Sequence, residues 1–111
     1  IGLELAQSIY SIVLDNKATG HTKNFNAEIA SVAKKDLKAG QKLDGEGGYC
    51  ARGRLISSKK SKQERILPMG FTDNATLKKD IKKDEFISLD DVELNLPKQI
   101  IEAREYQFNL I

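Results

Sequence analysis

A chain of 111 residues with 40% hydrophobic and 31% charged side chains has the composition of one folded globular domain, which excludes wholesale disorder. Its 18 basic and 16 acidic side chains give a net charge of +2, too small and too evenly mixed for a nucleic-acid footprint. No apolar run approaches the roughly 20 residues of a membrane-spanning helix. We therefore expect neither a nucleic-acid nor a membrane partner. The single cysteine, Cys50, excludes an internal disulfide, and we expect a cytoplasmic location.

The first periodic segment predicts a helix over residues 3–14. Its apolar residues recur three and four positions apart and share one face: Leu3, Ala6, Ile9, Tyr10, Val13 and Leu14. We expect this face to pack in the core. The chain begins at Ile1, without a methionine and inside the helical pattern, so we also expect an upstream part against which the face could pack. The polar residues that follow, including His21, are expected to form an exposed linker up to residue 27.

The second segment, residues 28–97, is expected to be a mainly β domain, because its short apolar runs are broken by glycine, proline and aspartate. The clearest runs predict strands at residues 29–33, 49–56, 75–79 and 92–96.

Two polar or mixed segments complete the expected organisation. Residues 57–65 lack a strand pattern and predict a solvated loop or a short helix, with a solvent-exposed basic run at Lys59, Lys60 and Lys62. Residues 98–111 form a C-terminal tail after Pro97, which we expect to be helical from about residue 100 to 108.

A lysine-rich unit occurs twice, forty-four positions apart. Residues 34–44 (KKDLKAGQKLD) correspond to residues 78–88 (KKDIKKDEFIS) through a shared Lys-Lys-Asp triplet, an aliphatic residue, a lysine, a turn former and a second aliphatic residue. Each copy indicates a tight turn before one buried aliphatic side chain, with Gly40 and Asp84 in equivalent turns. The repeat predicts that Leu43 and Ile87 occupy matching buried sites about an approximate two-fold axis.

The two copies diverge in the loops that follow them. After the second copy, Ser88 and Asp91 have the spacing of a capping box, in which each side chain bonds the backbone near the other. Capping therefore explains the adjacent acids Asp90 and Asp91 better than paired-carboxylate catalysis does. After the first copy, the glycine cluster at residues 45–48 predicts a loop.

The repeated unit resembles the SAF domain, a family named for sialic acid synthase, type III antifreeze protein and the flagellar P-ring chaperone. The resemblance rests on residues 32–43 (VAKKDLKAGQKL) and 79–92 (KDIKKDEFISLDDV). It implies a compact β-clip fold, here with an N-terminal helix and a short C-terminal helical tail. Asp84 stands where the SAF pattern usually has glycine.

Three further segments carry a narrower resemblance: residues 43–49 (LDGEGGY), 67–71 (LPMGF) and 90–94 (DDVEL). Together they resemble the C-terminal SAF region of NAD(P)-dependent oxidoreductases similar to homoserine dehydrogenase, some relatives of which act as alternative 1-deoxy-D-xylulose 5-phosphate reductoisomerases. The helix over residues 3–14 resembles the helix that precedes this domain there. The resemblance implies NAD(P) as the cofactor of the parent protein, bound by domains upstream of Ile1 that are partners of this chain.

We predict no catalytic, cofactor-binding or metal-ligating residue in the chain itself. A dinucleotide site needs Gly-x-Gly-x-x-Gly between a strand and a helix, a spacing that residues 45–48 lack. One histidine and one cysteine cannot supply the usual ligands of a zinc site. We expect His21 to be exposed in the linker and Cys50 to be a small buried apolar group in a strand.

Arg52 and Arg54 are the candidate residues for binding a small anion. They alternate along an expected strand, so both side chains share one face, as a phosphate or carboxylate clamp requires. Ordinary solvated charges on a strand would give the same pattern. If the chain binds an anionic substrate or a sugar acid, this pair is predicted to do so.

The leading interpretation is a non-catalytic C-terminal SAF domain of a homoserine dehydrogenase-like oxidoreductase, which aids assembly or closes over the substrate site. The alternatives are a sugar-acid-binding SAF module, as in sialic acid synthase and altronate dehydratase, and a periplasmic flagellar assembly chaperone. The GEGGY and LPMG motifs favour the first. A homo-oligomer is compatible with all three.

Overall fold

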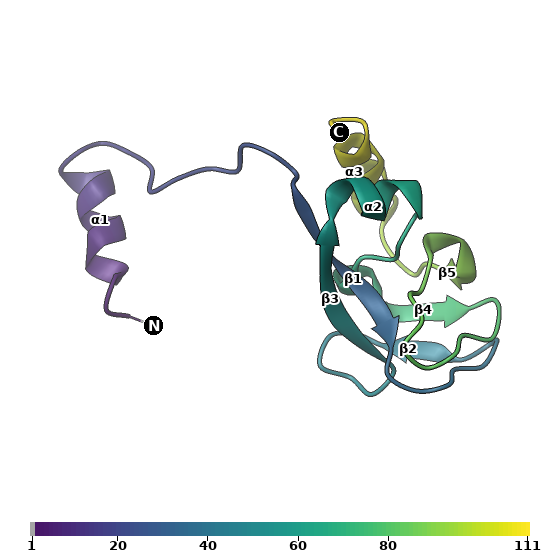
Figure 1. Ribbon diagram of the computed structural model, residues 1–111. Helices are drawn as coiled ribbons and strands as arrows, with labels where there is room; N and C mark the ends of the chain where they lie inside the picture. The colour runs from purple at the N-terminus through teal and green to yellow at the C-terminus, as the bar shows by residue number, and fades with distance from the viewer. Residues whose placement is uncertain (1) are drawn as a thin grey trace.

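An extended segment separates the N-terminal helix from a β domain in the computed structural model, which describes residues 2–111 (Figure 1). Helix α1 spans Leu5–Val13, and β1 begins the domain at Ala27–Ala33. The remaining elements are β2 (Lys42–Asp44), β3 (Ala51–Ser57), α2 (Ser58–Gln63), β4 (Asp73–Leu77), β5 (Val92–Glu93) and α3 (Lys98–Phe108), with single 3-10 turns η1 (Met69–Phe71) and η2 (Leu89–Asp91). Among residues 2–111, no helix has the length and hydrophobicity needed to cross a bilayer.

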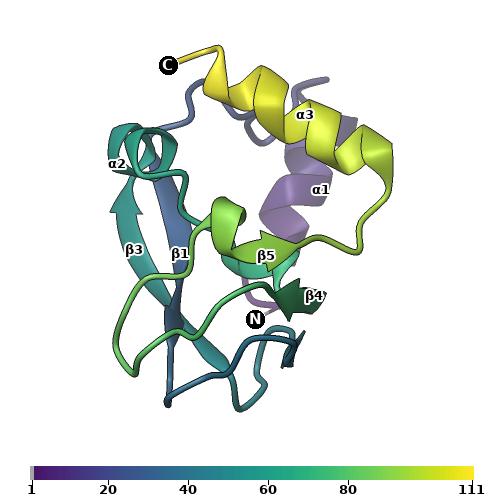
Figure 2. The ribbon, with the colours of Figure 1, turned by 90° about the vertical axis from the view of Figure 1, so that its right-hand side faces the viewer.

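Two small antiparallel sheets enclose the core. In the first, β1 pairs with β3 from Ala27 opposite Ser57 to Ala33 opposite Ala51. The second has the strand order β2-β4-β5. Helix α3 lies across the domain beside β5 (Figure 2). The buried side chains that form the core come from both sheets and from the segments between them: Ala33, Leu37, Leu43, Cys50, Ala51, Leu67, Met69, Ala75, Leu77, Ile81, Ile87 and Val92.

The two repeat copies cross at an antiparallel bridge and exchange equivalent hydrogen bonds. The N–H of Leu37 donates to the carbonyl oxygen of Ile81 at 2.8 Å, and the N–H of Ile81 donates back to Leu37 at 3.0 Å. A reciprocal exchange of this kind relates the two copies by an approximate two-fold rotation. The predicted equivalence of the copies is therefore confirmed.

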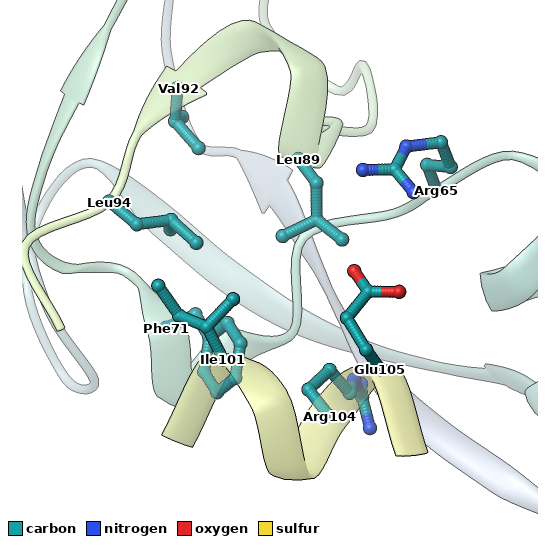
Figure 3. A pocket seen from close by; sticks show the side chains of 8 residues that line it. All are labelled: Arg65, Phe71, Leu89, Val92, Leu94, Ile101, Arg104 and Glu105. Carbon is teal, nitrogen blue, oxygen red and sulfur yellow. The ribbon is translucent and has the colours of Figure 1, made fainter. Parts of the chain in front are cut away.

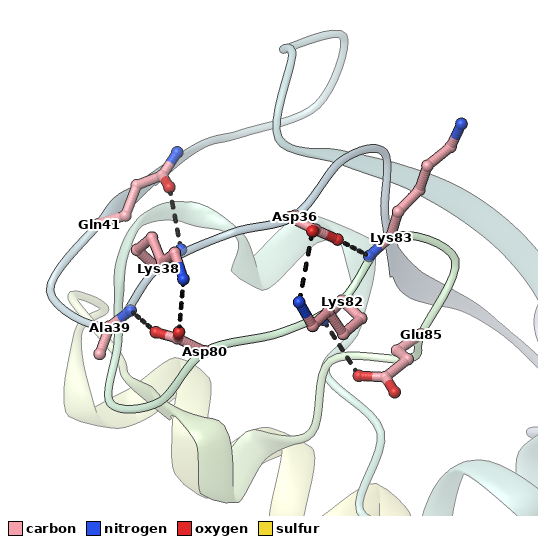
Figure 4. Close-up of polar contacts among 8 residues, drawn as sticks. All are labelled: Asp36, Lys38, Ala39, Gln41, Asp80, Lys82, Lys83 and Glu85. Carbon is pink, nitrogen blue, oxygen red and sulfur yellow. Dashed lines mark hydrogen bonds and ion pairs between the residues drawn. The ribbon is translucent and has the colours of Figure 1, made fainter.

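Two aspartates reinforce the crossing from opposite sides (Figure 4). Asp36 accepts the backbone N–H of Lys83 at 2.9 Å, and Asp80 accepts the backbone N–H of Ala39 at the same distance. Because these bonds favour the charged carboxylates, they are the largest cause that lowers the pKa of each aspartate. The third residue of each Lys-Lys-Asp triplet thus caps the turn of the other copy.

Gly40 and Asp84 occupy matching turns, as the repeat predicts. Their φ angles are +82° and +68°, both in the left-handed region. The N–H of Gly40 donates to Leu77, and the N–H of Asp84 donates to Ala33, at the end of β4 and of β1 respectively. Asp84 therefore keeps the turn geometry that glycine gives the first copy, at the steric cost of a Cβ atom.

The predicted strands at residues 29–33, 49–56 and 75–79 correspond to β1, β3 and β4. β3 begins at Ala51, two residues later than predicted, because the Asp44 carboxylate accepts the N–H groups of Tyr49 and Cys50 and closes the preceding loop. β4 begins and ends two residues earlier than predicted, and the chain bends away after Leu77.

Two other strand predictions need correction. The closing strand covers only Val92–Glu93 of the predicted residues 92–96, since its pairing with β4 ends there and the chain continues to α3 through Pro97. β2 was not expected as a strand, because a three-residue segment with one buried side chain, Leu43, is too short to show a period of two. The polar stretch 57–65 forms the short helix α2, and the tail is helical in α3.

Helix α1 forms where it is predicted, but the expectation that its apolar face packs in the core is wrong. None of its residues is buried, and Leu5 and Val13 remain 63% and 70% exposed. The β domain fills its core with its own side chains, and the extended segment holds α1 at a distance from it (Figure 1).

The equivalent aliphatic sites should make equivalent contributions to stability. Leu43→Ala and Ile87→Ala are each expected to lower the free energy of unfolding by roughly 2–5 kcal/mol, because the side chains are only 2% and 0% exposed. Leu55→Ala is the matched control, since Leu55 is 69% exposed, and should change stability by less than about 0.5 kcal/mol. Urea titrations measure all three. Core variants that behave like the control would contradict the packing described here.

The matching turns predict different responses to substitution. Gly40→Val should cost at least about 1–2 kcal/mol, because a β-branched residue is strained at positive φ; the space around the added Cβ is open, so the cost is one of backbone conformation. Asp84→Gly should stay within about 1 kcal/mol of wild type, since relief of strain offsets the loss of an exposed ion pair with Arg52. The same urea titrations apply, and a fully stable Gly40→Val variant would argue against the turn.

Candidate docking site

The strongest candidate for a functional surface is the apolar face of α1. At about 100° per residue, the apolar positions between residues 3 and 14, from Ile12 round to Leu14, cover roughly 200° of the helix circumference. This arc is about twice as wide as the stripe that a surface helix needs to pack on one core. The exposed large hydrophobic residues in it are Leu3, Leu5, Ile9, Tyr10, Ile12, Val13 and Leu14.

The polar side of α1 is partly covered, at two of its four residues. Ser8 and Ser11 are partly covered although they are polar. The carbonyl oxygen of Ser11 accepts the N–H of Lys17 at 2.9 Å, which turns the chain just after the helix. The apolar arc is exposed along its whole length, so a partner can reach it.

Helix α3 is held on the β domain by a buried ion pair that the sequence alone does not predict. Arg104 contacts Glu28 on β1, and their side chains are 9% and 12% exposed. The Arg104 guanidinium lies 5.0 Å from the Phe25 ring, 5.9 Å from Phe71 and 4.8 Å from Phe108. Burial lowers the pKa of Arg104, while the nearby charge of Glu105 opposes that shift. The one available signal was spacing, because position 104 falls in phase with the apolar positions of the helix.

Two further contacts fix the C-terminal end of α3. The Phe25 and Phe108 rings stack with their centroids 6.4 Å apart. Lys62 on α2 donates from Nζ to the carbonyl oxygens of Phe108 and Ile111, at 2.5 and 2.7 Å. A lysine next to the last carbonyls of a helix compensates their partial negative charge. The expected solvated basic run thus includes two lysines with structural contacts, since Lys60 Nζ also lies 3.8 Å from Glu64 and 4.9 Å from the centre of the Phe86 ring.

An apolar groove lies between α3 and the turn that carries η2 and β5 (Figure 3). Its volume is about 320 Å³. Leu94 lies at one end, and Arg65 and Glu105 lie at the other (Figure 3). The groove is an apolar surface of the domain, separate from α1.

Arg52 and Arg54 lie on one face of β3, as their alternation predicts. Arg52 Nη2 lies 3.1 Å from Asp84 Oδ1, and the Arg54 guanidinium lies 5.6 Å from the centre of the Phe86 ring. Both partners belong to the second repeat copy. The pair is therefore organised by the fold, and its binding of an anion stays a prediction.

The remaining residues singled out in the sequence have structural surroundings. His21 is exposed in the linker, and Cys50 is buried, 5% exposed. Burial raises the pKa of the Cys50 thiol, which disfavours a reactive thiolate. Ser88 and Asp91 form the predicted capping box, and Asp91 also contacts Lys79 at 2.8 Å. Within residues 2–111, no cluster of histidine, cysteine and acidic residues is arranged to hold a metal ion.

Two copies of one β unit, crossing at a shared bridge and completed by short turns, define a small pseudo-symmetric β domain of the β-clip class. The family model of the SAF domain matches residues 31–93, which include both repeat copies. The chain therefore belongs to the SAF domain family. A search of curated proteins finds no match to this chain.

The carboxylate of Asp44 gives the loop after the first copy a specific pH dependence. It accepts the N–H groups of Tyr49 and Cys50 at 2.6 and 3.0 Å, and the first of these bonds is the main cause that lowers its pKa to about 2. A carboxyl whose pKa is lowered in the folded state stabilises the fold above its ordinary pKa of 3.8. That contribution should disappear as the pH falls from about 4 to about 2.

We expect a carboxyl NMR titration to give Asp44 a pKa of about 2. Asp44→Asn should lose that part of the acid dependence of unfolding which lies in this pH window. An Asp44 pKa at its ordinary value, or an unchanged acid dependence in the variant, would contradict the loop closure.

Proposed function

We propose that this chain is the non-catalytic SAF domain of a larger NAD(P)-dependent oxidoreductase similar to homoserine dehydrogenase, and that α1 docks it on the catalytic part. The observation that carries the proposal is that α1 has a wide apolar arc and no buried residue. The role of the domain is to aid assembly or to close over the substrate site of that part. The narrower sequence resemblance, in the GEGGY and LPMG segments, supports the choice of parent enzyme.

The length of α1 supports an absent partner. A helix of nine residues is too short to be stable alone in water, where isolated helices below about 12–15 residues are marginal. Burial of an apolar face supplies that stability in folded proteins, and the β domain does not provide it here. A second surface that buries α1 accounts both for the stability of so short a helix and for its wide apolar arc.

The composition of the polar side favours a protein partner over a lipid surface. Helices that bind the membrane interface carry lysine and arginine on their polar side. The polar side of α1 carries Glu4, Gln7, Ser8 and Ser11, with no basic residue. An arc of roughly 200° also fits a groove between two elements better than a flat surface.

The purified chain is expected to oxidise no NADH or NADPH, because the chemistry is assigned to the upstream part. Absorbance at constant protein concentration, with aspartate semialdehyde as the carbonyl substrate, measures this. Cofactor consumption that persists through further purification would contradict the non-catalytic role. Phosphate and a sugar acid are titrated in parallel by calorimetry. Binding that is lost in the double variant Arg52→Ala, Arg54→Ala would instead favour the sugar-acid module.

The docking role of α1 is tested with the protein from the complete reading frame, separated into the part preceding Ile1 and this chain. We expect the two pieces to associate. Ile9→Asp, in the apolar arc, should weaken the association at least about tenfold, because it buries an unpaired charge. Gln7→Asp is the matched control on the polar side and should have little effect. Equal effects of both substitutions, or a preceding part without a dinucleotide-binding strand-turn-helix, would reject the proposal.

A further inference from the structure

β3 has one free edge. The bonds that flank its pairing with β1 run from the N–H of Ser58 to Asn26 and from the N–H of Lys34 to Cys50. In an antiparallel pair only alternate residues bond across to the neighbour. The register therefore directs the backbone groups of Arg52 and Arg54 toward β1 and those of Gly53 and Leu55 away from it. Within residues 2–111, β1 is the only strand that pairs with β3.

The opposite edge of β1 is already occupied. The N–H of Ser31 donates to the carbonyl oxygen of Leu67 at 2.9 Å, and the N–H of Ile87 donates to Ser31 at 3.0 Å. Two segments of the β domain thus complete β1 on that side. The place for an additional strand is consequently beside β3.

The two faces of this edge differ in chemistry. Arg52 and Arg54 are exposed on one face. On the other, Leu55 is 69% exposed and lies opposite Ile29, which is 45% exposed. A strand added here would lie next to two guanidinium groups on one side and next to Leu55 on the other, with Ile29 one strand further away, since side chains alternate along a strand.

Charge decides which strand fits. Antiparallel pairing of β3 with a second copy about Gly53 would place Arg52 of each copy opposite Arg54 of the other, and like charges directly opposite are destabilising. Acidic side chains at alternate positions would lie beside both arginines instead. The contact of Arg52 with Asp84 uses one guanidinium nitrogen, so other donors remain for a second carboxylate.

We propose that β3 binds an extended acidic segment of another protein by strand addition. The backbone groups of Gly53 and Leu55 bond the incoming strand. Arg52 and Arg54 recognise its acidic side chains, and Leu55 receives its apolar ones. This proposal does not rest on the docking of α1, which belongs to a different part of the chain.

The probes are two capped peptides, TEVEVET and TKVKVKT, which share length and strand propensity and differ in charge. In the free protein the amides of Gly53 and Leu55 should exchange with solvent faster than those of Arg52 and Arg54, which bond to β1. Saturating TEVEVET should slow exchange at Gly53 and Leu55 at least about tenfold, because these amides become hydrogen bonded. TKVKVKT should not.

Two sets of variants separate main-chain pairing from charge attraction. Leu55→Pro removes an outward N–H, which an edge strand tolerates, and should weaken TEVEVET binding at least about tenfold. Leu55→Val, which keeps both the N–H and an apolar side chain, is its control. The double variant Arg52→Glu, Arg54→Glu should no longer bind TEVEVET and should bind TKVKVKT instead, because the charge of the face is reversed.

Three results would overturn the proposal. Binding of TEVEVET without slower exchange at Gly53 and Leu55 would show attraction by charge alone. Equal protection by both peptides would show that the arginines do not select the strand. Protection at Gly53 that rises with protein concentration, in the absence of peptide, would identify a second copy as the occupant.

Discussion

The reciprocal bridge between Leu37 and Ile81 is the contact on which the rest of the β domain depends. Each turn makes one closing bond of its own, from the N–H of Gln41 to Lys38 or of Glu85 to Lys82, and each receives a further bond from an aspartate of the other copy. Leu37 and Ile81 are forty-four positions apart in the chain. Their contact therefore brings together the strands on either side of the two copies, β1 and β2 with β4 and β5. The aspartates Asp36 and Asp80 make that encounter specific, because each finds a backbone N–H only in the other copy.

The contacts of α3 show how the second half of the domain is positioned. Removing two opposite charges from water costs much of what their attraction returns, so a buried ion pair is weak evidence for added stability. The pair of Arg104 and Glu28 fixes the helix in one register on β1, and three aromatic rings enclose the guanidinium. Helix α3 consequently forms one wall of the apolar groove at a fixed distance from η2.

How far the sequence predicts this structure depends on the range of the contacts involved. The repeat identified the family, the matching turns and the buried sites of Leu43 and Ile87, since a periodic pattern carries that information locally. The placement of α1 could not be predicted, because an apolar stripe indicates that a face is buried and not which surface buries it. The pairing of Arg104 with Glu28 joins residues far apart in the chain. The sequence shows that Arg104 falls among the apolar positions of its helix, but not which acidic residue it contacts. Likewise, the alternation of Arg52 and Arg54 predicted a shared face, whereas the free edge of β3 follows only from the sheet topology.

The stacking of Phe25 on Phe108 has a consequence for the way such a domain is combined with others. The ring contact brings the point where the chain enters the β domain next to the point where its last helix ends. A folded unit whose entry and exit are adjacent can be spliced into a surface loop of a host without stretching either connection. The β domain can therefore be inserted into different host proteins in the course of evolution without a change in its core.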